Sequence, residues 1–214
     1  MRKECETFSK FLRGDAAGIR VGIDVDGTAA MTNHAIISAY NELKGTTFTV
    51  NDYNNWDVLE SKVRMPHDVY YELYNKLWLK EPHRIAPAAN PELMARLMGA
   101  FDVSASTCRP EEHRAPLSAW FEKNYGFVPK IDIVRSSSEK LQKGYDVIFE
   151  DAPHFIEEHS KVKSAQKPLV FLITNPWNQD CKVPERVIRK ENLDAAITSL
   201  LRMQEQLSPQ KVAR

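Results

Sequence analysis

The sequence predicts an α/β fold in which a Rossmann-like parallel sheet lies between layers of helices. Short apolar runs alternate with longer helix-type segments along most of the chain, which is the usual order when helices cross between parallel strands. The 214 residues are enough for one sizeable core with a small insert. Acidic, hydroxyl-bearing and basic residues follow several apolar runs, and such sheets bind ligands at the carboxyl ends of their strands.

The elements are expected in the following order. Strands are predicted at 19–25, 101–106, 131–134, 146–150 and 169–174, and helices at 33–43, 67–80, 91–99, 111–125, 153–163 and 191–206. Residues 31–89 break the alternation, because they carry many aromatic side chains and no convincing buried strand. We expect them to form a small helical cap inserted after the first strand, with a Pro-rich return linker at 82–91. The core would comprise 18–30 and 90–207, with an N-terminal tail or helix at 1–17 and a C-terminal tail at 208–214.

Charge and cysteine content exclude several classes of protein. Lys+Arg 29 balance Asp+Glu 29, so no overall charge indicates a nucleic acid or an anionic membrane as partner. The three cysteines match neither a zinc-site spacing nor a secreted disulfide framework, and reduced thiols are the simplest interpretation. The chain also lacks an apolar signal core and an apolar run long enough to span a bilayer. We therefore expect a soluble cytoplasmic protein.

The most informative motif is Asp24-Val25-Asp26-Gly27-Thr28, directly after the first predicted strand. In an extended segment Asp24 and Asp26 point to the same side, because side chains alternate with a period of two. Paired carboxylates suit a Mg²⁺ ion, which takes oxygen ligands. They also suit a carboxylate nucleophile with a second carboxyl group as proton donor. The alternative is an Asp-Gly turn with two solvated acids.

Two further polar groups follow the second and third predicted strands. The hydroxyl of Thr107 could bind a phosphate oxygen, and Arg109 could add positive charge, although this segment could equally begin a helix. Lys140 precedes the fourth predicted strand and could offset the charge of acids and phosphate, with Lys143 as a competing candidate.

A second acidic pair, Glu150 and Asp151, ends the fourth predicted strand. Asp151 could complete a metal site with Asp24. The alternative is that Asp151 caps the next helix, since Pro153 suits a first helical turn. Nothing about a stable fold requires all of these groups to follow strand ends together.

In this order, the motifs resemble those of the haloacid dehalogenase-like (HAD) hydrolase superfamily. Asp24–Thr28 matches the first motif, Thr107 the second, Lys140 the third, and Glu150 with Asp151 the fourth. The match covers about residues 19–177. The first and fourth motifs are specific, whereas the second and third are short.

Within that superfamily the chain most resembles the 5'(3')-deoxyribonucleotidase-type phosphatases. The segment 107–110, the spacing from Lys140 to Glu150, and the segment 174–178 are all similar to theirs. The spacing favours Lys140 over Lys143. Cys108 replaces a usual alanine, and 29–31 lacks an acid that often follows the first motif; these departures concern the substrate more than the reaction.

The resemblance implies phosphoryl transfer through an aspartyl phosphate. Asp24 would be the nucleophile, and Asp26 would protonate the leaving alcohol and then activate water. Mg²⁺ would be held by Asp24, Asp151 and the backbone carbonyl of Asp26, with Glu150 supporting the metal site. An acid at position 26 favours phosphatase chemistry over dehalogenation.

Thr107 and Lys140 would hold the phosphate, and aromatic residues of the cap could stack on a nucleobase. Candidates for the substrate pocket are Trp56, Trp78 and Trp177, although any one of these could belong to a core. The expected partner is a small phosphorylated molecule, most simply a (deoxy)nucleoside monophosphate.

Three hypotheses remain open. The first is a Mg²⁺-dependent phosphatase of nucleoside monophosphates, and the second is the same chemistry on another sugar phosphate or a nucleic-acid end. The third is a non-catalytic binding protein on this scaffold, which should have lost one of the acids or the lysine. A basic stripe near the pocket would favour a nucleic-acid end, but Lys80, His83 and Arg84 are too few. A homodimer is compatible with the sequence, and no residue specifies it.

Overall fold

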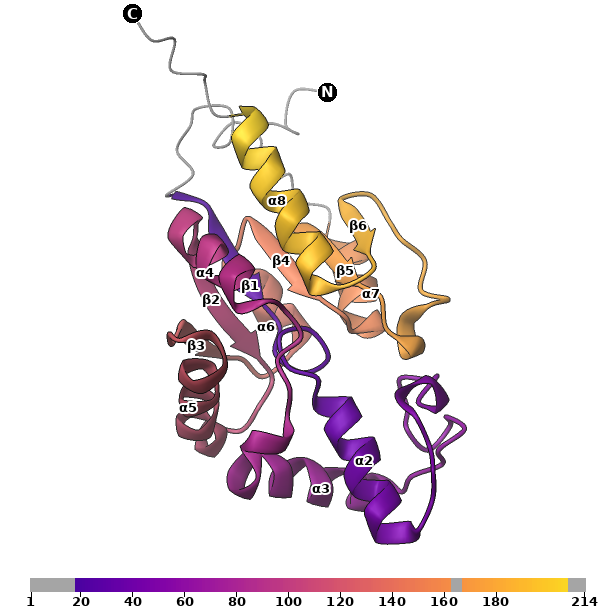
Figure 1. The fold of residues 1–214 in the computed structure, drawn as a ribbon. Coiled ribbons are helices and arrows are strands. Elements are labelled where there is room, and N and C mark those ends of the chain that lie inside the picture. The colour runs from indigo at the N-terminus through magenta and orange to yellow at the C-terminus, as the bar shows by residue number, and fades with distance from the viewer. Residues whose placement is uncertain (1–17, 163–166, 208–214) are drawn as a thin grey trace, which may run out of the picture.

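A single six-stranded parallel sheet forms the centre of the molecule (Figure 1). The computed structural model describes residues 18–162 and 167–207. The strands are β1 (Arg20–Ile23), β2 (Asp102–Thr107), β3 (Lys130–Ile133), β4 (Val147–Glu150), β5 (Leu169–Ile173) and β6 (Val187–Lys190). They pair in the order β3-β2-β1-β4-β5-β6, and every pair is parallel. The predicted fold class is therefore confirmed.

Helices cover both faces of this sheet. The α-helices are α2 (Thr32–Lys44), α3 (His67–Lys80), α4 (Pro91–Ala100), α5 (Arg114–Tyr125), α6 (Ser137–Gln142), α7 (Pro153–Lys161) and α8 (Leu193–Leu207). Short 3₁₀ turns are η2 (Val50–Asp52), η3 (Pro82–Arg84), η4 (Glu111–His113) and η5 (Pro176–Asn178). Alternate strand residues enter two apolar clusters: Phe149 packs with the cluster that includes Leu200 of α8, and Ile148 packs with the cluster that includes Phe155 of α7. Period-two alternation thus divides the core between the two faces.

Two elements were absent from the prediction. β6 has only two apolar residues in four and lies half-buried at the sheet edge, so its hydrophobic pattern is weak. α6 is six residues long and begins where the Ser136 side chain accepts a hydrogen bond from the Glu139 backbone N–H; Lys140 therefore lies on a helix. β1 is shorter than predicted, because the carbonyls of Asp24 and Val25 accept hydrogen bonds from a turn over residues 28–30, within which Gly27 has a φ of +80°.

Residues 31–89, which we call the insert, contain α2, α3 and short turns but no strand among the named elements. In Figure 1, α2 and α3 lie beyond the carboxyl ends of the strands. The two connections to the insert run side by side, since Met31 N donates to Ala86 O (2.9 Å) and Ala88 N donates to Ala29 O (2.9 Å). The Tyr125 hydroxyl on α5 also donates to Ala29 O (2.8 Å). The insert therefore joins the rest of the chain at one fixed place.

The expected tails at 1–17 and 208–214 lie outside the described residues. Within 18–162 and 167–207, no helix combines the length and the apolar character needed to cross a membrane.

Candidate active site

The carboxyl ends of β1 and β4 meet beneath the insert, at the point where the strand order reverses. Parallel α/β sheets bind ligands at such a reversal. A cavity of about 400 Å³ opens there and is lined from both sides, by Asp24 and Asp151 at the sheet and by Tyr70 and Tyr74 from α3. This volume is within the range of small-molecule sites.

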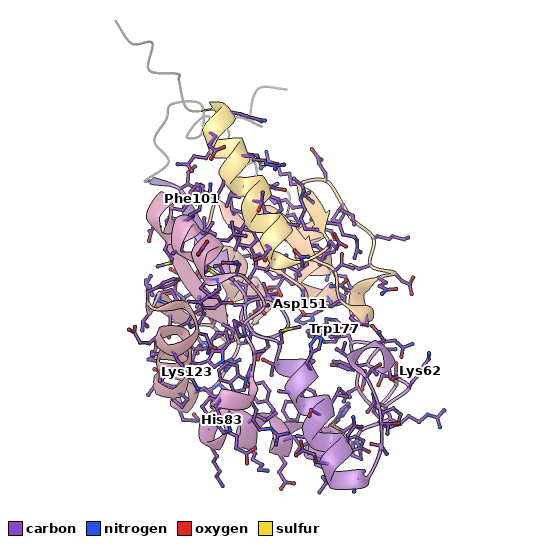
Figure 2. The ribbon with its side chains drawn as sticks, viewed as in Figure 1. Lys62, His83, Phe101, Lys123, Asp151 and Trp177 are labelled. Carbon is purple, nitrogen blue, oxygen red and sulfur yellow. The ribbon has the colours of Figure 1, made fainter. Side chains whose placement is uncertain are left out.

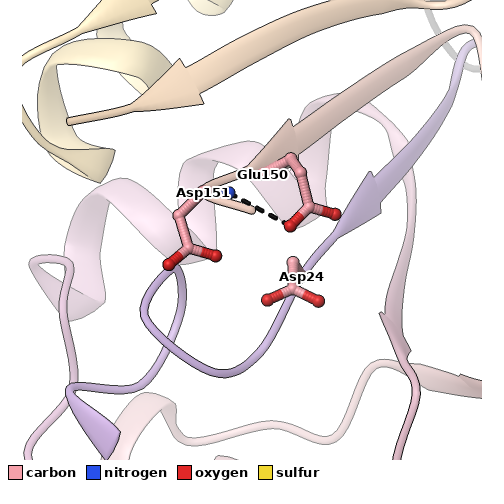
Figure 3. Close-up of side chains that lie close together, drawn as sticks. All are labelled: Asp24, Glu150 and Asp151. Atoms are coloured by element: carbon pink, nitrogen blue, oxygen red, sulfur yellow. Dashed lines mark hydrogen bonds between the residues drawn. The ribbon is translucent and has the colours of Figure 1, made fainter. Parts of the chain in front are cut away.

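Three carboxyl groups converge in the cavity (Figure 3). One ligand atom each from Asp24, Glu150 and Asp151 lies within 4.8 Å of the others. The Asp24 backbone N–H donates to Phe149 O (2.9 Å), which extends the pairing of β1 with β4 beyond the strand and brings the two acidic motifs together. Glu150 Oε1 accepts hydrogen bonds from the backbone N–H of Asp151 (3.1 Å) and Ala152 (3.2 Å). The local backbone therefore fixes the Glu150 carboxylate.

Lys140 is the cation of this cluster. Its Nζ donates to Asp24 Oδ1 at 2.6 Å and to Glu150 Oε2 at 2.8 Å, and its side chain is only 3% exposed. Burial alone would lower the pKa of Lys140, but Asp24 and Glu150 outweigh burial and raise it, so the amine stays protonated. Lys143 instead lies 3.6 Å from Glu139. Of the two predicted candidates, the structure brings Lys140 to the acids.

The acids remain crowded despite this lysine. Burial, followed by the charge of Glu150, raises the pKa of Asp24 to about 7, although Lys140 opposes the rise. Burial also raises the pKa of Asp151 well above its ordinary value, and the charges of Asp24 and Glu150 add to the rise. Oxygen ligands with unbalanced negative charge are the donor set that a hard divalent cation prefers, so the residues present fit such an ion.

Asp151 is held in place by the loop after β5. The Trp177 indole Nε1–H donates to Asp151 Oδ2 (3.0 Å), and the Asn178 amide donates to the Asp151 carbonyl (2.8 Å). Figure 2 shows Asp151 and Trp177 together between the sheet and the insert. The Thr28 hydroxyl donates to Asp151 Oδ1 at 3.3 Å. The residue at the N-cap of α7 is Ala152, without a side-chain cap, so the alternative of Asp151 as a helix cap is wrong.

The Asp26 carboxylate makes its hydrogen bonds with a different set of side chains from those of the Asp24–Glu150–Asp151 cluster. Its carboxylate accepts from the Thr32 hydroxyl (2.6 Å), the Tyr74 hydroxyl (3.0 Å), and Arg109 through Nε (3.0 Å) and Nη2. Arg109, predicted to bind phosphate, is thus an ion-pair partner of Asp26. Sequence reasoning missed Thr32 and Tyr74. Tyr74 follows Tyr70 by four residues on α3, a spacing that places both rings on one helix face, and this was the available signal.

The remaining predicted residues divide into lining and buried groups. Thr107, at the end of β2, lines the cavity together with the exposed Cys108 and with Trp56, which is 41% exposed. Trp78 and Trp177 do not line it, which corrects their prediction as pocket residues. Trp78 is fully buried beneath the Arg109 guanidinium, and Trp177 is buried against Asp151.

Solved structures share this architecture across nearly their whole length. A HAD-superfamily hydrolase, subfamily IA, variant 1, from Geobacter sulfurreducens PCA is 14% identical and aligns over 86% of this chain and 97% of its own, with a TM-score of 0.50. The chain has the haloacid dehalogenase-like fold. A Bacillus subtilis protein assigned as a HAD hydrolase and bound to magnesium is 13% identical, over 88% of this chain and 99% of its own, with a TM-score of 0.50.

A Bacteroides vulgatus protein assigned as a β-phosphoglucomutase has the same HAD-like fold. It is 12% identical over 97% of this chain and 99% of its own, with a TM-score of 0.50. No protein-family model and no curated protein matches the sequence.

Proposed function

We propose that the protein is a Mg²⁺-dependent phosphatase that hydrolyses a small phosphomonoester, most simply a (deoxy)nucleoside monophosphate, through an aspartyl phosphate. The observation that carries this proposal is the joint placement of Asp24, Glu150, Asp151 and Lys140 at the point where the sheet order reverses. A scaffold that had lost catalysis would not need to keep three buried acids and a buried lysine together, because burying charges is costly.

The metal would be held by Asp24, Asp151 and the backbone carbonyl of Asp26, and Glu150 would orient Lys140 and the metal site. When bound, Mg²⁺ neutralises charge on the transferring phosphoryl group. The charge balance supports this assignment, because three carboxyl groups face one ammonium, and their full ionisation would leave an excess of two negative charges for a divalent cation to neutralise. The Trp177 and Thr28 hydrogen bonds would fix Asp151 as a ligand.

The chemistry proceeds in two displacements. A carboxylate oxygen of Asp24 attacks phosphorus in line, the bond from phosphorus to the leaving oxygen breaks, and Asp26 gives its proton to that oxygen. Asp26 then takes a proton from a water molecule, whose oxygen attacks the phosphorus of the aspartyl phosphate. The phosphorus–Asp24 bond breaks, which restores the carboxylate and releases inorganic phosphate. Lys140 and Thr107 stabilise the charge on the phosphoryl oxygens.

In this proposal the insert is the cap that selects the leaving group. Its contribution to the cavity is largely aromatic, with Tyr53, Trp56, Tyr70, Tyr71 and Tyr74. A planar nucleobase would gain about 1–3 kcal/mol from each ring on which it stacks. Contacts between rings already hold the cap against the core, since the Trp56 ring lies 4.9 Å from that of His154 and the Tyr53 ring lies 5.1 Å from that of Trp177.

The test is phosphate release from a panel of nucleoside 5'- and 3'-monophosphates, sugar phosphates and 5'-phosphorylated oligonucleotides, with Mg²⁺ or with EDTA. We expect Mg²⁺-dependent release that Asp24→Asn reduces to background, while Asp102→Asn, at the opposite end of β2, retains activity. The ranking of the panel identifies the leaving group. A folded, Mg²⁺-loaded protein that releases phosphate from no member of the panel contradicts the proposal.

A further inference from the structure

Arg109 has an environment unlike that of a residue that binds substrate. Both Arg109 and its partner Asp26 contribute to the cavity lining, but the Arg109 side chain is only 1% exposed, whereas that of Asp26 is 27% exposed. Nε and Nη2 of Arg109 contact the two carboxylate oxygens of Asp26, one each. This parallel arrangement fixes the rotation of the carboxylate as well as its position, because both oxygens are held by one planar group.

Trp78 in turn fixes Arg109. The guanidinium carbon lies 3.6 Å from the centre of the Trp78 ring, which is fully buried. A cation so close to an indole face is held by the ring's quadrupole as well as by packing. The Tyr74 ring also lies 5.5 Å from the same carbon, and its hydroxyl donates to Asp26 Oδ2. The guanidinium is thus positioned by the buried Trp78 ring and the partly buried Tyr74 ring.

We propose that Arg109, supported by Trp78, is a positioning residue that aims the Asp26 carboxyl group at the leaving oxygen. This inference rests on the proposed phosphatase function. It assigns Arg109 a role through Asp26 instead of a contact with phosphate, since two of its nitrogens are already bonded to Asp26 and Nη1 is buried without a hydrogen-bond partner among the described residues. Substrate affinity should then depend little on Arg109, whereas proton delivery should depend on it strongly.

The dependence on the leaving group separates the two roles. An alkyl phosphomonoester releases a strongly basic alkoxide and needs the proton from Asp26. 4-Nitrophenyl phosphate releases a stabilised phenolate and needs it far less. A well-placed general acid contributes about 10²–10⁴-fold, so a misaligned one should slow the alkyl ester selectively. Loss of a phosphate contact would slow both esters and raise KM for both.

The experiment compares the wild type with Arg109→Lys, which keeps the charge but loses the planar fork. In single turnovers with enzyme in excess, the rate of leaving-group release reports the first displacement alone, without the later hydrolysis step that also uses Asp26. We expect this rate to fall at least about tenfold more for the alkyl ester than for 4-nitrophenyl phosphate, with half-saturating concentrations within about threefold. Arg20→Lys is the matched control, because Arg20 begins β1 at the opposite end of the sheet and also lies over an aromatic ring, that of Tyr145. It should leave both rates unchanged.

Trp78→Phe provides the second variant, since it leaves Arg109 and Asp26 unchanged and reduces the ring beneath the guanidinium, which also packs against Trp120. It should shift the ratio of the two single-turnover rates in the same direction by a smaller factor. Equal loss of the single-turnover rate on both esters, or a change confined to the half-saturating concentration, overturns the positioning role while leaving the phosphatase proposal intact. A wild type that hydrolyses neither ester nor any member of the nucleotide panel overturns both.

Discussion

Replacing Lys140 by methionine should be among the most damaging single changes in the core. Its Nζ makes two short contacts, with Asp24 at 2.6 Å and Glu150 at 2.8 Å, and all three side chains are largely buried. A charged hydrogen bond contributes about 1.5–3 kcal/mol, so losing two would cost about 3–6 kcal/mol. Breaking a buried ion pair by removing one partner typically costs about 3–5 kcal/mol, in agreement with that range. Methionine retains most of the volume, so packing contributes little.

The assay is urea unfolding of metal-free protein, with Lys143→Met as the matched control. Lys143 is one-third exposed and lies 3.6 Å from Glu139, so its loss should cost no more than about 1 kcal/mol. Without Lys140 the buried acids should retain a proton when folded but lose it when unfolded. The free energy of unfolding of Lys140→Met should therefore fall further as pH rises from about 5 to 8, because the folded state then binds more protons than the unfolded chain. Equal costs for the two lysines, or a cost below about 1 kcal/mol for Lys140→Met, would refute the reasoning.

Three other outcomes follow from the described contacts. Burial lowers the pKa of His159 to about 4, below the value of about 6.5 in an unfolded chain. As the pH falls, the unfolded state therefore takes up the proton before the folded state does. About 1–2 kcal/mol of the free energy of unfolding should be lost from pH 7 to pH 5. Urea titrations should show that His159→Gln removes this loss, and an unchanged loss contradicts it. Gly27→Ala should abolish Mg²⁺ binding in calorimetry, because its Cβ would lie 2.2 Å from Asp151 Oδ2. The control is Gly126→Ala, which has a similar φ and open space around the added Cβ, and which should lose stability only. Mg²⁺ binding retained by Gly27→Ala counts against the metal site. Mg²⁺ at a hundred times its Kd should stabilise the wild type by about 2.7 kcal/mol and raise its Tm, reversibly with EDTA, and an equal rise in Asp151→Asn excludes Asp151 as a ligand.

The sequence predicted the fold and the acidic cluster because both depend on short-range patterns. Strand-type runs that alternate with helices define a parallel sheet, and the order of strands then brings the ends of β1 and β4 together. Asp24 and Asp151 each follow one of these strands directly, so their meeting required no knowledge of side-chain conformations. β6 escaped prediction because an edge strand with two apolar residues lacks the hydrophobic run that marks a central strand.

Short-range sequence patterns could not predict that Arg109 pairs with Asp26, for a physical reason. Position 109 follows β2, which pairs with β1, and Arg109 lies among the residues that line the cavity. The guanidinium could bind either phosphate or Asp26, and the group packed against its face decides between them. That group is Trp78 from α3, in the insert. The sequence pattern around a tryptophan does not distinguish one that lines a pocket from one that packs beneath a cation, because both environments are apolar. The insert therefore contributes to the candidate site through Trp78, which contacts Arg109, as well as through the rings that line the cavity. A comparison of Arg109→Lys with Trp78→Phe measures that contribution.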